Sequence, residues 1–398
     1  MTISNSDYTT CKFFNLLHLL FIRMALVPVF MGCSGHTEDL SVSKKLVDGN
    51  KNLTLKIDDQ TPNFSFGLNY FHDTKPWLFS LNQQQNELQM YDINESKLFK
   101  KLTFEIEGDK GVGQIQGFHV HNLDSIFLFP NFTNTIYLTD TSQAKIQKIT
   151  YEVPSMHTPA FVLMHSFASP PVIRGDQMIV KTRPEGNYRK MKNEELSTRH
   201  LTYSIHLNNG ETVPIKHYHP DGYLSGGAKN FEFSFAASED KMVYSFFADH
   251  HLYYSNSTES EIKAVSAPSN YLKEDFPNHP LSDVTFENLK YTFASAHYGG
   301  IIYDQYRDVF YRFCFPEAEA KNQEEIMQLR GFPNTFSIMI LDGELNVLGE
   351  TLFDGGQYVP NNCFVAEEGL YISINHPDNP DNKEDFLSFA LLTLEENN

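Results

Sequence analysis

The sequence predicts an all-β protein, a six-bladed β-propeller preceded by a lipoprotein signal peptide and a short tether. Three observations lead to this prediction. The chain of 398 residues contains 33 Phe and 20 Tyr, which favour β-strands. Short alternating apolar runs, separated by turn residues, recur along most of the chain. An apolar segment near the N-terminus ends at a Gly-Cys pair and gives way at once to polar residues.

The N-terminal segment predicts a leader of residues 1–32 and a polar tether of residues 33–52. Arg23 interrupts the apolar stretch, and a central Arg disfavours a membrane helix by about 2.5–3.5 kcal/mol. The stretch Leu26–Leu40 resembles the lipobox of bacterial lipoproteins. This resemblance implies that Cys33 carries the lipid and holds the protein on a membrane of the bacterial cell envelope. An uncleaved anchor and a soluble cytoplasmic chain are the alternatives.

The propeller is expected over residues 53–398, where a hairpin pattern occurs six times. In each copy, two short strand-like runs flank a turn rich in Asp, Asn, Ser or Gly. Most neighbouring copies start roughly 50 residues apart, and such a period indicates a repeat fold. The copies begin near Glu87, Asn134, Leu201, Leu252, Phe336 and Phe386.

A second hairpin pattern precedes these copies, so that each repeat supplies four strands. Four-stranded units repeated around an axis make a β-propeller. Residues 53–57 add one more strand-like run, which we expect to complete the last blade and close the ring. A pair of β-sandwiches, or a generic all-β chain with similar turns, is the alternative fold. Clear examples of the second hairpin are Gly117–Pro130, Phe231–Ala248, Gly299–Cys314 and Cys363–Ile374.

Two segments interrupt the strand pattern. Glu317–Phe332 is the best candidate for a helix and should end near Gly331. Arg183–His200 is charged and is expected to form an exposed loop or a short helix. The remaining cysteines of the expected propeller, Cys314 and Cys363, lack the spacing of a zinc site and are expected to be buried free thiols. A disulfide between them, formed in an oxidising compartment, is the alternative.

The repeat pattern, together with the stretches Tyr298–Phe313 ("YGGIIYDQYRDVFYRF") and Gly369–Ile374 ("GLYISI"), resembles a family of uncharacterised lipoproteins from Bacteroidetes-type bacteria. The likeness covers most of residues 51–394. It implies a six-bladed, TolB-like propeller and a location in the cell envelope, on either the periplasmic or the surface face of the outer membrane. The resemblance implies no reaction and no cofactor.

The charge of the chain limits its partners. The formal net charge is −19, and a field of that sign repels the phosphates of nucleic acids. We therefore expect no nucleic-acid partner. The motifs of a phosphate-binding loop, a dinucleotide site and a serine-hydrolase elbow are absent from the sequence, so we assign no catalytic residue and no cofactor.

Two groups of residues are candidates for ligand binding. His119 and His121 lie two positions apart, so a strand would place both imidazoles on one face. A metal needs further ligands, and none is identifiable, so we assign no metal. Asp304, Arg307 and Arg312 flank a turn that could lie at the mouth of the propeller. Hydrogen bonds that hold this turn are the structural alternative.

The sequence therefore predicts a lipid-anchored envelope propeller that binds a protein or a glycan through one end. The alternative is an envelope hydrolase or lyase with a metal-assisted site in the central channel, for which Asp304, His119 and His121 would be the first residues to test. A purely structural envelope protein is a further alternative. Because propellers serve many functions, the fold alone does not decide among them.

Overall fold

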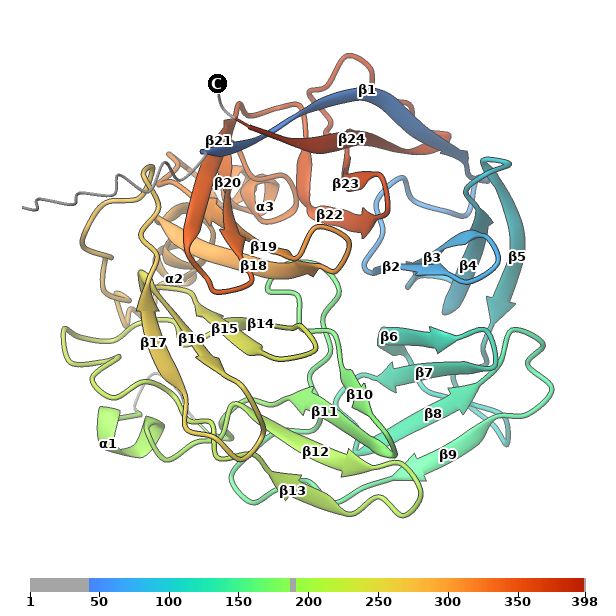
Figure 1. Ribbon diagram of the computed structural model, residues 1–398, viewed down its shortest axis with the longest axis horizontal. Helices are drawn as coiled ribbons and strands as arrows, with labels where there is room; N and C mark the ends of the chain where they lie inside the picture. Colours follow the sequence, from blue (N-terminus) through green and yellow to red (C-terminus); the bar gives the residue numbers. More distant parts are fainter. Residues whose placement is uncertain (1–42, 187–190, 397–398) are drawn as a thin grey trace, which may run out of the picture. The chain divides into compact units, whose positions relative to one another are not determined.

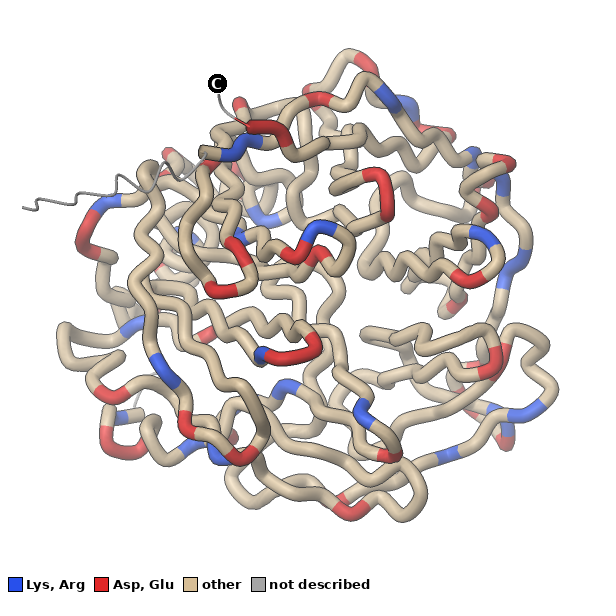
Figure 2. Tube along the Cα trace, viewed as in Figure 1, with Lys and Arg blue, Asp and Glu red and all other residues tan. Residues whose placement is uncertain are grey.

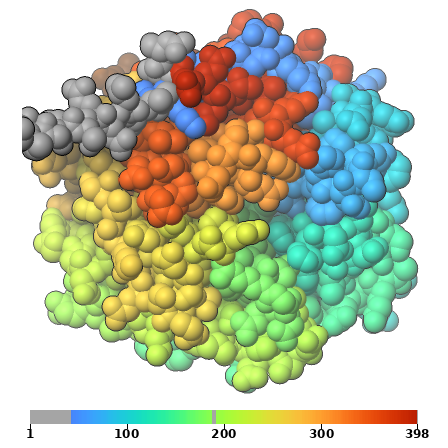
Figure 3. All heavy atoms as spheres, in the orientation of Figure 1, coloured from blue at the N-terminus to red at the C-terminus, as the bar shows by residue number. Residues whose placement is uncertain are grey.

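The computed structural model describes residues 43–186 and 191–396. These residues form six four-stranded antiparallel sheets, arranged as blades around a central axis (Figure 1). The predicted all-β, six-bladed propeller is therefore confirmed. Figure 3 shows the blades packed side by side, with a surface that is recessed near the centre of the ring.

Blades 1 to 3 each consist of four consecutive strands. Blade 1 contains β2 (Leu68–His72), β3 (Pro76–Asn82), β4 (Glu87–Asp92) and β5 (Lys97–Thr103). Blade 2 contains β6 (Ile115–Asn122), β7 (Ser125–Pro130), β8 (Thr135–Thr139) and β9 (Gln147–Thr150). Blade 3 contains β10 (Val172–Arg174), β11 (Gln177–Lys181), β12 (Thr202–His206) and β13 (Thr212–Pro214).

Blades 4 and 5 repeat this order, and blade 6 takes its outer strand from the start of the propeller. Blade 4 contains β14 (Phe233–Ala237), β15 (Met242–Phe246), β16 (His251–Ser255) and β17 (Lys263–Ser266). Blade 5 contains β18 (His297–Asp304), β19 (Val309–Phe315), β20 (Phe336–Asp342) and β21 (Val347–Phe353). Blade 6 contains β22 (Val359–Ala366), β23 (Gly369–Ser373), β24 (Phe386–Glu396) and β1 (Lys44–Lys56).

Strand β1 closes the ring by pairing antiparallel with β24 (Figure 1). Leu55 lies opposite Leu387 in this pair and is completely buried between blades 6 and 1. The predicted closing strand is confirmed, but it begins at Lys44, inside the segment 33–52 predicted as a tether. Residues 44–52 are mostly polar, and their register shifts after Asp48, so they lack the alternation that marks a strand in the sequence.

The hydrophobic core is divided among the six interfaces between neighbouring blades. Trp77 and Phe79 of blade 1 pack with Phe118 of blade 2, and similar clusters fill the other five interfaces. Each blade therefore buries both faces of its sheet, while its outer strand is more exposed. The exposed turns carry many Asp and Glu side chains, in line with the net charge of −19 (Figure 2).

A segment between β9 and β10, residues 161–171, passes along the central axis. Met164 forms a parallel bridge to Gly67, just before β2. The Ala168 carbonyl accepts a hydrogen bond from the Phe235 backbone N–H of β14 at 3.1 Å. A Cβ on Gly117 of β6 would lie 2.6 Å from the Val162 carbonyl oxygen, so only glycine permits this approach. The segment thus contacts the innermost strands of several blades and lies along the axis between its two ends.

The described residues contain three helices, which lie in insertions between strands. Helix α1 (Asn193–Leu196) is one turn within the predicted insertion 183–200, of which residues 187–190 lie outside the described part. Helix α2 (Thr285–Ala294) connects blades 4 and 5, and α3 (Gln323–Gly331) packs against it. The predicted helix Glu317–Phe332 starts later than expected because Asn322 caps it, accepting a hydrogen bond from Glu325 N at 2.9 Å.

The described residues contain no helix that is both long and apolar enough to span a bilayer. The predicted signal peptide and Cys33 lie outside the described residues. Both Cys314 and Cys363 are free thiols; Cys314 is buried and Cys363 is partly exposed.

Truncation of Leu55 tests the closing strand. Leu55→Ala should lower the free energy of unfolding by about 2–5 kcal/mol, because it leaves a cavity at the interface that joins the ends of the ring. Thr54→Ala changes an exposed neighbour on the same strand and should have an effect within about 0.5 kcal/mol. Denaturant titration measures both variants, and equal losses would contradict the role assigned to β1.

Candidate functional site

The central segment separates two cavities at opposite ends of the propeller axis. The helix-side cavity has a volume of about 320 Å³ and is lined by the starts of inner strands together with residues of α2 and α3. The hairpin-side cavity has a volume of about 440 Å³ and lies where the inner strands turn into the second strands. Ser166 and Phe167 of the central segment line the first cavity, and Met164 and Ala168 line the second.

A buried ion cluster supports the helix-side cavity. Glu232, directly before β14, binds Lys181 of β11 through one carboxylate oxygen and Arg183 through the other. The Lys181 ammonium also donates to the Phe233 carbonyl, and its side chain is completely buried. Paired groups of this kind are the form in which charges are tolerated in a protein interior. The cluster holds Arg183 and Glu232 in place at the cavity wall.

The charges of the cluster shift one another's protonation. Burial lowers the pKa of Lys181 to about 8, although the carboxylate of Glu232 opposes this shift. Burial acts to raise the pKa of Glu232, but the charges of Lys181 and Arg183 outweigh it and hold that pKa below its usual value. Near neutral pH the cluster therefore carries two positive charges and one negative charge.

Besides Arg183 and Glu232, His165 and Arg330 contribute to the polar wall of the helix-side cavity. The Arg183 guanidinium stacks on Phe161, with its central carbon 3.5 Å from the ring centroid, and its buried Nε has no hydrogen-bond partner. The buried Nδ1 of His165 also has none, and burial lowers the pKa of this histidine. Arg330, at the end of α3, lines the same cavity. Glu232 is the only acidic residue among the described residues of the lining.

A groove of about 350 Å³ adjoins the helix-side cavity and shares Leu163, His165, Arg183 and Arg330 with it. Its described lining contains no acidic residue, but it presents side-chain amides and the ring of Phe132, which is 76% exposed. The amides of the groove are those of Gln83, Gln116 and Asn131, and the cavity adds Asn230, Asn334 and Asn361. These groups can both donate and accept hydrogen bonds.

The predicted histidines lie together at the other end of the axis. His119 and His121 project from β6 into the hairpin-side cavity, with ring centroids 6.4 Å apart. The buried Nδ1 of His119 has no partner, and burial, with a smaller effect of His121, lowers its pKa to about 4. Within residues 43–186 and 191–396, no three His, Cys, Asp or Glu side chains are grouped closely enough to hold a metal.

Asp304 and Arg307 act on the turn between β18 and β19. The Asp304 carboxylate accepts from Arg307 Nε at 2.5 Å and from the Tyr311 hydroxyl at 3.1 Å. Arg307 also donates to the carbonyls of Ala366 at 2.7 Å and Glu367 at 2.8 Å, in blade 6. These contacts agree with the structural alternative, in which hydrogen bonds of Asp304 and Arg307 hold the turn. The pair also links the turns of two neighbouring blades.

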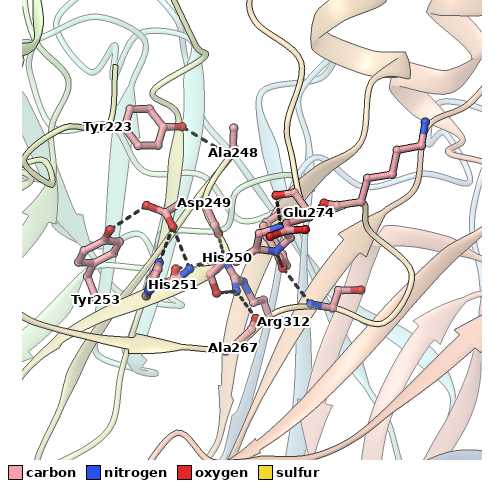
Figure 4. Close-up of polar contacts among 12 residues, drawn as sticks. Tyr223, Ala248, Asp249, His250, His251, Tyr253, Ala267, Glu274 and Arg312 are labelled. Atoms are coloured by element: carbon pink, nitrogen blue, oxygen red, sulfur yellow. Dashed lines mark hydrogen bonds and ion pairs between the residues drawn. The ribbon is translucent and has the colours of Figure 1, made fainter. Parts of the chain in front are cut away.

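Arg312 does not fit the predicted ligand-binding role. It is completely buried, and its guanidinium carbon lies 3.3 Å from the ring centroid of Tyr298. Its nitrogens donate to Asp249 O at 2.7 Å and Ala267 O at 2.9 Å (Figure 4), and to Ser245 Oγ at 2.9 Å, all in or beside blade 4. Arg312 thus joins blade 5 to the interior of blade 4 and faces neither cavity.

The sequence reasoning missed Lys181, Arg183, Glu232 and Arg330. One signal was available: Lys181 and Glu232 each stand in a mostly apolar, strand-like run, "QMIVK" and "FEFSF". A charged residue in such a run is expected to have a buried partner. The identity of that partner is not contained in the local pattern.

Comparison with known proteins places this propeller in a family. The family described as "Domain of unknown function (DUF4221)" matches residues 43–352. The chain belongs to the DUF4221 family. The expected resemblance to an uncharacterised family with a six-bladed propeller is thereby confirmed for the family and the fold. No curated protein is similar to the chain in sequence.

Solved structures support the assignment to DUF4221. A member of the family from Bacteroides vulgatus has a TM-score of 0.79 and 25% identity, with 90% of this chain and all (100%) of that one covered. A "Putative exported protein" from Bacteroides fragilis has a TM-score of 0.52 and 11% identity, covering 90% of this chain and 97% of the other. The second likeness concerns the fold alone.

Replacement of Arg312 tests its assignment to the blade interface. Arg312→Met should lower the free energy of unfolding by about 3 kcal/mol or more, because several buried carbonyls lose their donor. Lys263→Met, on the exposed face of β17, is the matched control and should be nearly neutral. Denaturant titration compares them. A stable Arg312→Met variant would show that the network is dispensable.

His297 should make the stability of the protein depend on pH. Its ring is stacked between Phe247, at 4.7 Å, and Phe315, at 5.0 Å, and burial lowers its pKa to about 4. Below the unfolded pKa of about 6.5, the unfolded state binds a proton that the native state does not. The free energy of unfolding therefore decreases as the pH is lowered from about 6.5 towards about 4. His297→Gln lacks this effect, and its stability deficit should shrink by about 2 kcal/mol between pH 7 and pH 4.5.

The control for this measurement is Leu55→Ala, which removes no titrating group and should keep a constant deficit over the same pH range. Denaturant titrations at a series of pH values measure both variants. A deficit of His297→Gln that stays constant would contradict a His297 that is neutral in the folded protein.

Proposed function

We propose that this DUF4221 protein is a binding module of the bacterial cell envelope, anchored through a lipid on Cys33, that holds a protein or glycan ligand at its helix-side cavity. One observation carries the proposal: this cavity combines fixed charged side chains with buried polar atoms that have no partner. Such atoms are rare in proteins, and each one calls for a ligand or another explanation.

The cavity wall is preorganised for binding. Glu232 and the ring of Phe161 fix the guanidinium of Arg183, while its Nε is left without a partner. A donor that is already held in place loses little conformational freedom when a ligand arrives. The volumes of the cavity and of the adjoining groove lie within the range of roughly 300–1,000 Å³ typical of ligand pockets.

The envelope location is proposed from the leader. The lipobox-like sequence ends at Cys33, and the tether and β1 would connect the lipid directly to the propeller. The structurally similar protein from Bacteroides fragilis is described as a putative exported protein, which agrees with this location.

The second candidate function is an envelope hydrolase or lyase with a metal-assisted site on the axis. It is favoured by the unpaired Nδ1 of His119 next to His121 in the hairpin-side cavity. Because residues 161–171 occupy the channel, such a site would be limited to the hairpin end. Loss of an activity on chelation, restored by a metal and absent in His121→Ala, would favour this candidate over binding.

Substitution of the proposed lipid site tests the anchor. Cys33→Ala should move the protein from the membrane fraction to the soluble fraction, because no thiol would be available for the lipid. Ser34→Ala is the control and should stay in the membrane fraction. Fractionation of cells followed by mass spectrometry of the mature N-terminus measures both. An unmodified N-terminus or an unchanged distribution would contradict the lipid anchor.

Site-specific photo-cross-linking tests the binding function. A photoreactive residue in place of Phe132, at the rim of the helix-side groove, should capture a ligand in intact cells. The same residue in place of Tyr306, which is exposed near the hairpin end, is the control. Cross-linked products from position 306 alone would show that the ligand binds at the hairpin end and not at the helix-side cavity. Products from neither position would contradict the proposal.

A further inference from the structure

We infer that the ligand of the helix-side cavity is a glycan that carries carboxylate groups. This inference rests on the proposed binding function and names the chemical class of the ligand. It is based on the charge of the lining, the geometry of its cationic groups and the character of the side chains around them.

The charge of the cavity is opposite to that of the protein. The chain has a net charge of −19, yet the described residues that line the cavity and its groove include Arg183 and Arg330 and one acid, Glu232. Glu232 is already bound to Lys181 and Arg183. The positive charge of Arg330 has no ion pair with any described residue. A concave surface with this excess of positive charge attracts anions.

The cationic groups have the form that carboxylates require. Both are guanidinium groups, whose planar N–H donors match the two oxygens of a carboxylate. Arg183 is fixed by its stack on Phe161 and by its bond to Glu232, and its buried Nε has no hydrogen-bond partner. His165 lies beside both arginines in the shared part of the lining, and its buried Nδ1 is likewise unpaired.

The surroundings of the two arginines suit a sugar. Side-chain amides line both parts of the site and can bind hydroxyl groups as donors and as acceptors. Phe132 lies at the rim with 76% of its surface exposed and with a φ of 53°, a left-handed conformation that is unfavourable for a bulky residue. Strain of this kind is often retained at binding sites, and here it presents an aromatic ring on which the apolar face of a sugar can pack.

Calorimetry with matched glycans tests the inference. The full chain, purified in detergent, would be titrated with tetrasaccharides of galacturonate, alginate and hyaluronan, and with the methyl ester of each. At least one acid form should bind at least ten-fold more tightly than its ester, and the affinity should fall as salt is raised. Equal affinities of acid and ester, or tighter binding of inorganic phosphate than of every acid form, would overturn the inference.

Variants locate the effect. Arg330→Ala, at an exposed position at the end of α3, should weaken binding of the acid form at least ten-fold and leave the melting temperature unchanged. Arg330→Lys retains the charge without the planar guanidinium, and its affinity for the acid form should lie between those of the unmodified protein and Arg330→Ala. Arg174→Ala, on the exposed hairpin side, is the control and should bind normally. Normal binding by Arg330→Ala would overturn the assignment of the carboxylate site.

The outcome can be separated from that of the proposed function. If position 132 still captures a ligand in cells but no acidic glycan binds, the binding function stands and the carboxylate inference is wrong. If position 132 captures nothing and no acidic glycan binds, both are wrong.

Discussion

The structure depends on the pairing of β1 with β24. Antiparallel hydrogen bonds between these strands join the two ends of the described propeller and give blade 6 its outer strand. The same strand places Leu46 against blade 5 and Leu55 against blade 1, so a single element contributes to two of the six interfaces. Closure holds the inner strands at fixed distances from the axis. Both cavities contain residues of those strands or of the loops that lead into them, and α2 and α3 add residues to the helix-side cavity.

The central segment gives the two ends of the propeller different characters. Its path along the axis requires close approach of backbones, which the glycine at position 117 permits. Towards α2 and α3 it contributes His165 and Ser166 to a cavity that contains two arginines and a glutamate. Towards the hairpins it contributes Met164 and two prolines to a cavity whose described lining has no Lys, Arg, Asp or Glu. One insertion therefore divides the channel into two chemically distinct sites.

The protein buries positive charge in two different ways. Among the described residues, no carboxylate forms an ion pair with Arg312. Its nitrogens donate to the backbone carbonyls of Asp249 and Ala267 (Figure 4) and to the Ser245 hydroxyl, and its guanidinium stacks on Tyr298. This arrangement uses the donors of the guanidinium and leaves none facing a cavity. Lys181 and Arg183 share Glu232 instead, and Arg183 keeps an unpaired donor at the cavity. The first arrangement stabilises an interface, whereas the second prepares a surface for a ligand.

The sequence alone determined the blades, because a strand and its turn depend on neighbours within a few residues. The alternating apolar runs and the Asp, Asn and Gly turns predicted the hairpins and the closing strand without knowledge of any distant contact. The start of β1 at Lys44 was missed because an outer strand with a register shift shows little alternation. The functional site was decided only by the tertiary structure. Arg183, Glu232 and Arg330 come from segments of two different blades and from a helical insertion, and they gather at one cavity only when the ring is closed. Arg312 likewise has its role set by the carbonyls of a neighbouring blade, which its own strand pattern does not encode.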